Sequence, residues 1–123
     1  MKTKLLAGLV LTIFCMGPAY AATQLYYDGP DMGHYGVAEN WTDDNLPSDN
    51  TEVAVINTSA ITVLHDLTDG TNQAWEITVF APKSSAAPVL SVSGGTLNTG
   101  NHFRVANDLD THAVLSMSEG TIN

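Results

Sequence analysis

Basic residues are scarce in this chain of 123 residues, where four Lys and Arg stand against thirteen Asp and Glu and give a formal charge of −9. A surface with this balance repels phosphate backbones, which argues against nucleic-acid binding. Charged residues make up 14% of the chain and apolar residues 44%, enough to bury a core and to argue against wholesale disorder. The length allows one domain of ordinary size.

Cysteine is nearly absent as well, since Cys15 is the only one in the chain. It falls in a segment with two lysines at the start, an apolar run over residues 5–16 and an Ala-x-Ala ending at Ala21. These three parts predict a secretory signal peptide over residues 1–21, with an apolar run too short to span a membrane. We therefore expect an exported chain, extracellular or at the cell surface, with no disulfide and no transmembrane segment after cleavage.

Long helical patterns are missing after this leader, which predicts an all-β domain. Residues 22–50 are rich in Gly, Pro, Asp and Asn, and we interpret them as a loop-rich N-terminal cap with one short strand near residues 24–27. Residues 51–123 hold short apolar stretches, rich in β-branched side chains and bounded by turn residues, as strands are. The stretches are Val53–Ile56, Ile61–Leu64, Trp75–Phe80, Val89–Val92, Phe103–Val105 and Val114–Met117.

An internal repeat is the most informative feature of the sequence. The segment Val89–Asn98 recurs as Val114–Asn123 at an offset of 25 residues, with seven of ten positions identical. A period near 25 residues without helices is typical of one turn of a parallel β-solenoid, in which each turn stacks on the last. Residues 51–123 are long enough for about three turns. The alternative is a small β-sandwich in which two hairpins share similar turns.

The strand alternation within the repeat assigns each side chain a direction. Leu90 and Val92 should face the interior, with the equivalent residues of the second copy directly above them. Asn98 over Asn123 would form an amide ladder that fixes the register. Because the chain ends inside the second copy, we expect residues 51–123 to be the front part of a longer repeat array.

Three segments together carry a family resemblance: Asn40–Asn50 with its Asn-Trp pair and Pro, the strand Val53–Asn57 ending in Ile-Asn, and the Ser-Gly-Gly-Thr-Leu motif of Ser93–Asn98. They resemble the N-terminal part of secreted bacterial repeat proteins with autotransporter-associated β-strand repeats, which often end in a PEP-CTERM sorting signal. The match covers roughly residues 40–123. It implies an exported right-handed parallel β-helix that serves as a surface stalk, adhesin-like passenger or matrix component.

Acidic side chains gather in two loops. Asp43, Asp44 and Asp49 are the candidate Ca²⁺ ligands of the first loop, and Asp66 with Asp69 flank the second. Calcium takes six to eight oxygen ligands, which such loops can supply together with backbone carbonyls. The spacing matches no EF-hand, however, and we interpret both loops as solvated acidic turns with no obligatory cofactor.

The histidines show no metal-binding spacing. His34, His65, His102 and His112 are scattered without a His-x-His or His-x-x-x-His pattern, so we expect them at the surface on strand edges. Arg104 lies between two apolar residues of a strand and should point outward into a structural salt bridge.

Aromatic residues suggest a second kind of site. Tyr27, Trp41 and Trp75 are candidates for glycan contact, because exposed rings stack on sugar faces; Tyr26 and Tyr35 lie nearby in the sequence. In the competing interpretation, which we favour, Trp41 and the nearby tyrosines cover the open end of the first turn. We predict no catalytic residue.

The sequence favours a non-enzymatic exported β-solenoid, structural or adhesin-like. Surface polysaccharide or other surface proteins are the expected partners. The alternative is a carbohydrate-binding module or the start of a polysaccharide-acting β-helix enzyme. The sequence leaves the oligomeric state open.

Overall fold

The computed structural model describes residues 22–48, 51–106 and 108–123. The predicted signal peptide, with Cys15, lies outside the described residues. Nine strands and two short 3₁₀ helices are found in the described part of the chain. Their bounds are β1 Thr23–Tyr26, β2 Gly33–His34, η1 Ala38–Asn40, η2 Thr42–Asp44, β3 Glu52–Ile56, β4 Thr62–His65, β5 Thr71–Val79, β6 Ala81–Pro82, β7 Val89–Val105, β8 Thr111–His112 and β9 Val114–Ile122.

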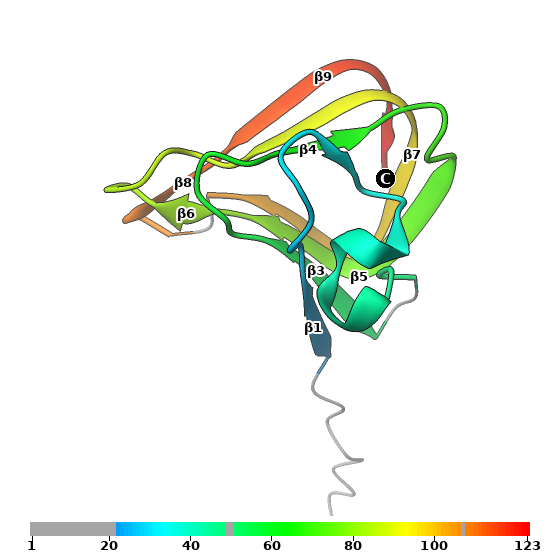
Figure 1. Ribbon diagram of the computed structural model, residues 1–123, viewed down its shortest axis with the longest axis horizontal. Coiled ribbons are helices and arrows are strands. Elements are labelled where there is room, and N and C mark those ends of the chain that lie inside the picture. The colour runs from blue at the N-terminus through cyan, green and yellow to red at the C-terminus, as the bar shows by residue number, and fades with distance from the viewer. Residues whose placement is uncertain (1–21, 49–50, 107) are drawn as a thin grey trace, which may run out of the picture.

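The strands stack in parallel into three faces of a solenoid with about four turns. Face I contains β1, β3, residues 76–79 of β5 and residues 102–105 of β7. Face II contains β2, β4, and the first parts of β7 and β9. Face III contains the first part of β5, the middle of β7 and the end of β9. Figure 1 looks along the stacking direction and shows the three sides enclosing a common interior.

The internal repeat occupies consecutive turns, as predicted. Val89 pairs with Val114 and Leu90 with Leu115, in parallel and at the expected offset. Asn123 Nδ2 donates to Asn98 Oδ1 at 3.0 Å, which is the predicted amide ladder. The parallel β-solenoid is confirmed, and the β-sandwich alternative is wrong.

The interior is filled by alternate residues of the strands. Leu90, Val92 and Leu97 are completely buried, so the inward direction assigned to the repeat is confirmed. Each turn contributes one layer of such side chains to a continuous core. The layers include Leu25, Ala54, Ile56, Ile61, Val63, Ala74, Ile77, Val79, Leu90, Val92 and Leu97.

Residues 22–48, interpreted from the sequence as a loop-rich cap, form a turn of the solenoid themselves. Strand β1 pairs with β3 from Thr23 opposite Glu52, and β2 pairs with β4. The count of turns is therefore about four rather than three. Where the other turns have a face III strand, this first turn has η1 and η2, and Trp41 between them packs edge-on against Tyr27 and Tyr35.

Glycine occupies one corner of the solenoid in successive turns. Gly95 and Gly120 both adopt positive φ, 69° and 90°, immediately before their face III strands. A Cβ atom on Gly95 would lie 2.5 Å from the Gly70 carbonyl oxygen and 2.7 Å from the His65 ring. The tight stacking of this corner therefore requires a residue without a side chain.

An antiparallel pair of short strands projects from the solenoid between faces I and II, at the left of Figure 1. Ala81 of β6 pairs with His112 of β8, and Pro82 with Thr111.

Within the described residues, no helix has the length and apolar character needed to cross a membrane.

Candidate functional site

A groove of about 490 Å³ runs along the outer surface of face I. Neighbouring turns all contribute to it, because every second residue of each face I strand points outward. Val55 and Thr78 are the most buried of its lining residues, at 4% and 5% exposure, and form its floor. The lining residues are Ala22, Gln24, Tyr26, Val53, Val55, Asn57, Trp75, Glu76, Thr78, Phe80 and Arg104.

The groove is amphipathic because aromatic rings and polar groups share its surface. Trp75 lies at the irregularity in β5, between Ala74 and Glu76, where the strand passes from face III to face I. Such irregularities redirect side chains, and this one places the indole among the lining residues of the groove. Tyr26, 39% exposed, and Phe80 supply further rings.

A small ion-pair network orders the polar part of the groove. The Arg104 Nε lies 3.2 Å from Glu76 Oε1, and Thr78 Oγ1 donates to the same oxygen at 3.0 Å. His102 Nδ1 lies 3.8 Å from Glu76 Oε2. The salt bridge predicted for Arg104 is therefore confirmed, and it joins the third turn to the fourth.

Two of the three aromatic residues proposed for glycan contact are not available at the surface. Tyr27 and Trp41 are each 1% exposed, so the prediction that they contact glycan is wrong. The alternation along β1 turns Tyr26 outward and Leu25 and Tyr27 inward, and the Trp41 indole is anchored by donating to the Tyr35 carbonyl at 2.7 Å. Trp41 lies instead in the core cluster with Tyr27 and Tyr35, and its predicted role as a cover for the end of the first turn stays a prediction.

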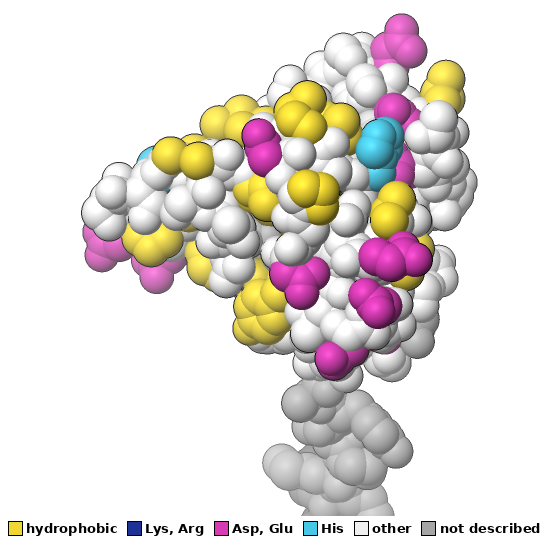
Figure 2. Space-filling view, viewed as in Figure 1, with side chains coloured by type: hydrophobic (Ala, Val, Ile, Leu, Met, Phe, Trp, Pro, Cys, Tyr) yellow, Lys and Arg dark blue, Asp and Glu magenta, His cyan; other side chains and the backbone are white. Residues whose placement is uncertain are grey.

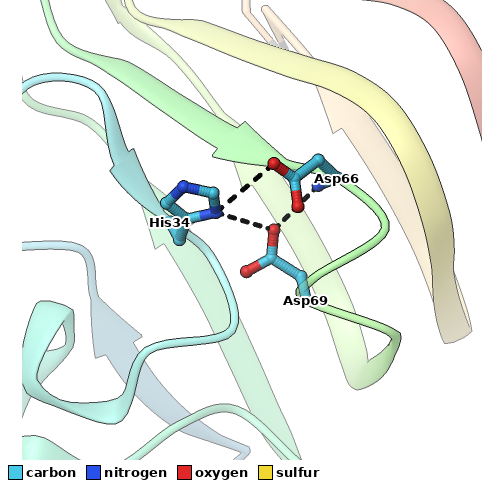
Figure 3. A group of neighbouring side chains, drawn as sticks. All are labelled: His34, Asp66 and Asp69. Carbon is cyan, nitrogen blue, oxygen red and sulfur yellow. Dashed lines mark hydrogen bonds and ion pairs between the residues drawn. The ribbon is translucent and has the colours of Figure 1, made fainter.

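A second cluster lies at the corner between faces II and III, where His34 of the first turn meets Asp66 and Asp69 of the second (Figure 3). His34 Nδ1 is 3.1 Å from Asp69 Oδ2 and 3.9 Å from Asp66 Oδ2. Side-chain exposure is 35% for His34, 33% for Asp66 and 3% for Asp69. Solvent can therefore reach His34 and Asp66, whereas the side chain of Asp69 is buried.

Hydrogen bonds fix the orientation of both carboxylates. Asp66 Oδ1 accepts from the Thr68 backbone at 2.7 Å and from its hydroxyl at 2.6 Å. Asp69 Oδ1 accepts from the Gly36 backbone at 2.9 Å, and its Oδ2 accepts from the Asp66 backbone at 2.7 Å. The hydrogen bond to Asp69 raises the pKa of His34, and the bonds from Thr68 lower the pKa of Asp66.

A buried histidine lies next to this cluster. His65 is 0% exposed, so its expected place at the surface is wrong. Its Nδ1 lies 2.9 Å from the Gly94 carbonyl and its Nε2 3.3 Å from Asn72 Nδ2. Since a carbonyl only accepts, we assign the proton to Nδ1, which leaves Nε2 to accept from Asn72. The alternation along β4 explains the burial, because His65 shares its inward side with Val63.

The other three histidines, also predicted to lie at the surface, differ in exposure. His102 is exposed on face I, whereas His34 and His112 are partly buried. The Nε2 atom of His112 is buried without a hydrogen-bond partner.

The candidate Ca²⁺ ligands are only partly described by the structure. Asp43 and Asp44 are exposed and adopt positive φ in η2, and Asp49 lies outside the described residues. Among the described residues, the group of three metal-ligand side chains that converges is His34, Asp66 and Asp69. The Ca²⁺ site stays a prediction.

Sequence reasoning missed both the groove and the His34 cluster, because each is assembled from different turns. The acidic loop of Asp66 and Asp69 was visible, but only the pairing of β2 with β4 brings His34 beside it. No protein-family model, curated protein or solved structure matches the chain.

Proposed function

We propose that this chain is a non-enzymatic, exported β-solenoid, structural and adhesin-like, which holds a polysaccharide in the groove of face I. The groove is the observation that carries the proposal, since it follows the stacked turns and combines aromatic rings with hydrogen-bonding groups. The resemblance to autotransporter-associated repeat proteins supports a place at the cell surface or in the extracellular matrix.

The chemistry of the groove suits a sugar chain. A pyranose ring has apolar C–H faces and a hydroxyl rim, and so calls for an aromatic platform beside polar partners. Trp75, Phe80 and Tyr26 supply apolar ring surface. The amides of Gln24 and Asn57 can both donate and accept hydrogen bonds to hydroxyls.

Charge favours a neutral polysaccharide over an acidic one. The chain has a formal charge of −9, so its overall field repels polyanions. Arg104, the basic residue of the groove lining, is already paired with Glu76. A uronate chain would have to compete with that carboxylate for the guanidinium.

The interactions of the Glu76 side chain support a role of the groove in binding rather than in catalysis. Glycoside hydrolysis generally uses two carboxylates that flank the bond to be cleaved. Glu76 is the acidic residue of the groove lining, and its oxygens face Arg104, His102 and Thr78. It is placed to order the groove and to accept hydrogen bonds from hydroxyls.

Affinity electrophoresis of the purified chain tests the proposal, with gels containing xyloglucan or galactomannan as neutral polysaccharides and alginate as the acidic one. We expect retardation by a neutral polysaccharide, at least tenfold weaker for Trp75→Ala. Leu109→Ala is the matched control, because Leu109 is an 85% exposed apolar residue outside the groove. No retardation by either neutral polysaccharide, or equal retardation of Trp75→Ala and the parent chain, would overturn the proposal.

A further inference from the structure

We propose that His34, Asp66 and Asp69 form a binding site for one divalent transition-metal ion of the Zn²⁺ type, which joins the first turn of the solenoid to the second. The proposal concerns the corner between faces II and III and is independent of the groove on face I.

The separations of the three side chains match a shared ion. Imidazole nitrogen and carboxylate oxygen bind Zn²⁺ at about 2.1 Å, so two ligand atoms of one ion lie at most about 4.2 Å apart. The His34 Nδ1 atom is 3.1 Å from Asp69 Oδ2 and 3.9 Å from Asp66 Oδ2. Those two separations lie inside this limit, and all three ligand atoms lie within 4.8 Å of one another, so a small side-chain adjustment brings the two carboxylate oxygens onto one ion.

The surrounding hydrogen bonds already aim the ligands. Thr68 holds the Oδ1 atom of Asp66, and Gly36 holds the Oδ1 atom of Asp69, which leaves both Oδ2 atoms directed at His34. Outer hydrogen bonds of this kind orient ligands in known metal sites. Asp69 Oδ2 accepts from the Asp66 backbone and retains a lone pair for an ion.

Charge in this region also favours a cation. Two carboxylates converge here, and the imidazole of His34 is their partner in the structure. The described residues contain two Lys or Arg side chains, Lys83 and Arg104, and Arg104 pairs with Glu76 on face I. Figure 2 shows acidic side chains spread over the visible end of the molecule, with no dark blue Lys or Arg among them.

The donor set selects the class of ion. One imidazole nitrogen with two carboxylate oxygens suits Zn²⁺ and its neighbours, whereas Ca²⁺ and Mg²⁺ prefer oxygen ligands alone. Binding at Nδ1 places the imidazole proton on Nε2. Because His34 and Asp66 are each about one-third exposed, water can complete the coordination.

Isothermal titration of the purified chain with ZnCl₂, without a histidine tag, tests the site. We expect one Zn²⁺ per chain and a higher melting temperature with Zn²⁺ than with Ca²⁺. Asp66→Asn is the main variant, since an amide oxygen can still accept from Thr68 while the second ligand oxygen is lost. It should weaken Zn²⁺ binding at least tenfold.

Two further variants keep the test decisive. His34→Gln retains a side-chain donor for Asp69 but removes the imidazole, and should lose binding even if Asp66→Asn folds poorly. His102→Gln removes an exposed histidine beside Glu76 on face I and should bind Zn²⁺ as the parent chain does. Absence of Zn²⁺ binding by the parent chain, or equal binding by the parent, Asp66→Asn and His34→Gln, would overturn the proposal.

Discussion

Core side chains are buried to different degrees at the two ends of the solenoid. At the first turn, Trp41 packs at 4.8 Å from Tyr35 and 5.4 Å from Tyr27, and all three side chains are buried. At the fourth turn, Leu115 is half-buried and Met117 is 46% exposed. Within the described residues, β9 pairs with β7 alone, so its other edge has no strand stacked on it.

The difference shows that the burial of a repeat residue depends on the turns stacked against it as well as on its own position in the repeat. Leu90 and Leu115 occupy equivalent positions of the repeat and pair directly, yet Leu90 is 0% exposed because a turn covers it on both sides. In a solenoid, the stability of one turn depends strongly on its interfaces with adjacent turns. In the first turn, Tyr27, Tyr35 and Trp41 fill the interior and are themselves buried.

Removal of the buried Trp41 indole should give the largest effect. Trp41→Ala deletes a completely buried indole and the hydrogen bond to Tyr35, and we expect a loss of about 4 kcal/mol in the free energy of unfolding by urea. Trp75→Ala is the control, since that indole is only half-buried in the groove, and it should cost about 1 kcal/mol. Equal losses for the two variants would contradict the expectation that the buried Trp41 indole contributes more to stability than the half-buried Trp75 indole.

The same substitution in two copies of the repeat should sharpen the comparison. We expect Leu90→Ala to destabilise the chain by about 3 kcal/mol and Leu115→Ala by about 1 kcal/mol, because cavity cost follows burial. Urea unfolding of both variants, under one set of conditions, measures the difference. A larger loss for Leu115→Ala than for Leu90→Ala would contradict the assignment of interior and end turns.

Alkaline pH should weaken the tyrosine-containing end. Burial, with smaller effects from Asp31 and Asp28, raises the pKa of Tyr27 from 10.0 to about 12. Because the folded-state pKa lies above the unfolded value, the stabilisation is complete below pH 10 and is lost as the pH rises toward 12. The loss should amount to about 2–3 kcal/mol, given about 1.4 kcal/mol per pKa unit.

Urea unfolding at pH 9 and pH 11.5 measures this loss. Tyr27→Phe should show a smaller decrease between the two pH values than the parent chain. A decrease of equal size in both proteins would mean that Tyr27 is not the titrating group.

The smallest expected effect concerns a buried hydroxyl in the first turn. The Tyr35 hydroxyl is buried without a hydrogen-bond partner, and burial raises its pKa strongly. Removing an unsatisfied buried polar group relieves its desolvation cost, so Tyr35→Phe should stabilise the chain by about 1 kcal/mol. Thermal unfolding checks this, and a lower melting temperature for Tyr35→Phe would reveal a partner for the hydroxyl.

The same contrast explains how much of the fold the sequence could predict. Near the C-terminal end, Leu90 with Leu115 and Asn98 with Asn123 are like residues at a constant offset, and this identity fixes the register. The first turn has no such motif, and η1 and η2 replace its face III strand. Its place in the stack follows from tertiary pairing that the local composition does not encode.

The candidate sites were less predictable because they depend on register between unlike turns. The groove requires Tyr26, Val55 and Thr78 to align on three neighbouring turns, which only the pairing of β1, β3 and β5 establishes. His65 is different, because a signal was present: it continues the inward alternation of Ile61 and Val63. The sequence prediction placed His65 at the surface because it gave more weight to the polarity of histidine than to this alternation.

Disulfide cross-linking between turns tests the central claim, that the repeat copies stack in parallel and in register. Two double variants, Ser91→Cys with Ser116→Cys and Asn98→Cys with Asn123→Cys, are made in a Cys15→Ser background. Parallel stacking brings both pairs within the roughly 4–7 Å Cα separation of a disulfide, so each should form an intramolecular bond under mild oxidation. Antiparallel strands or separate sheets would leave at least one pair unlinked, and that result would contradict the solenoid.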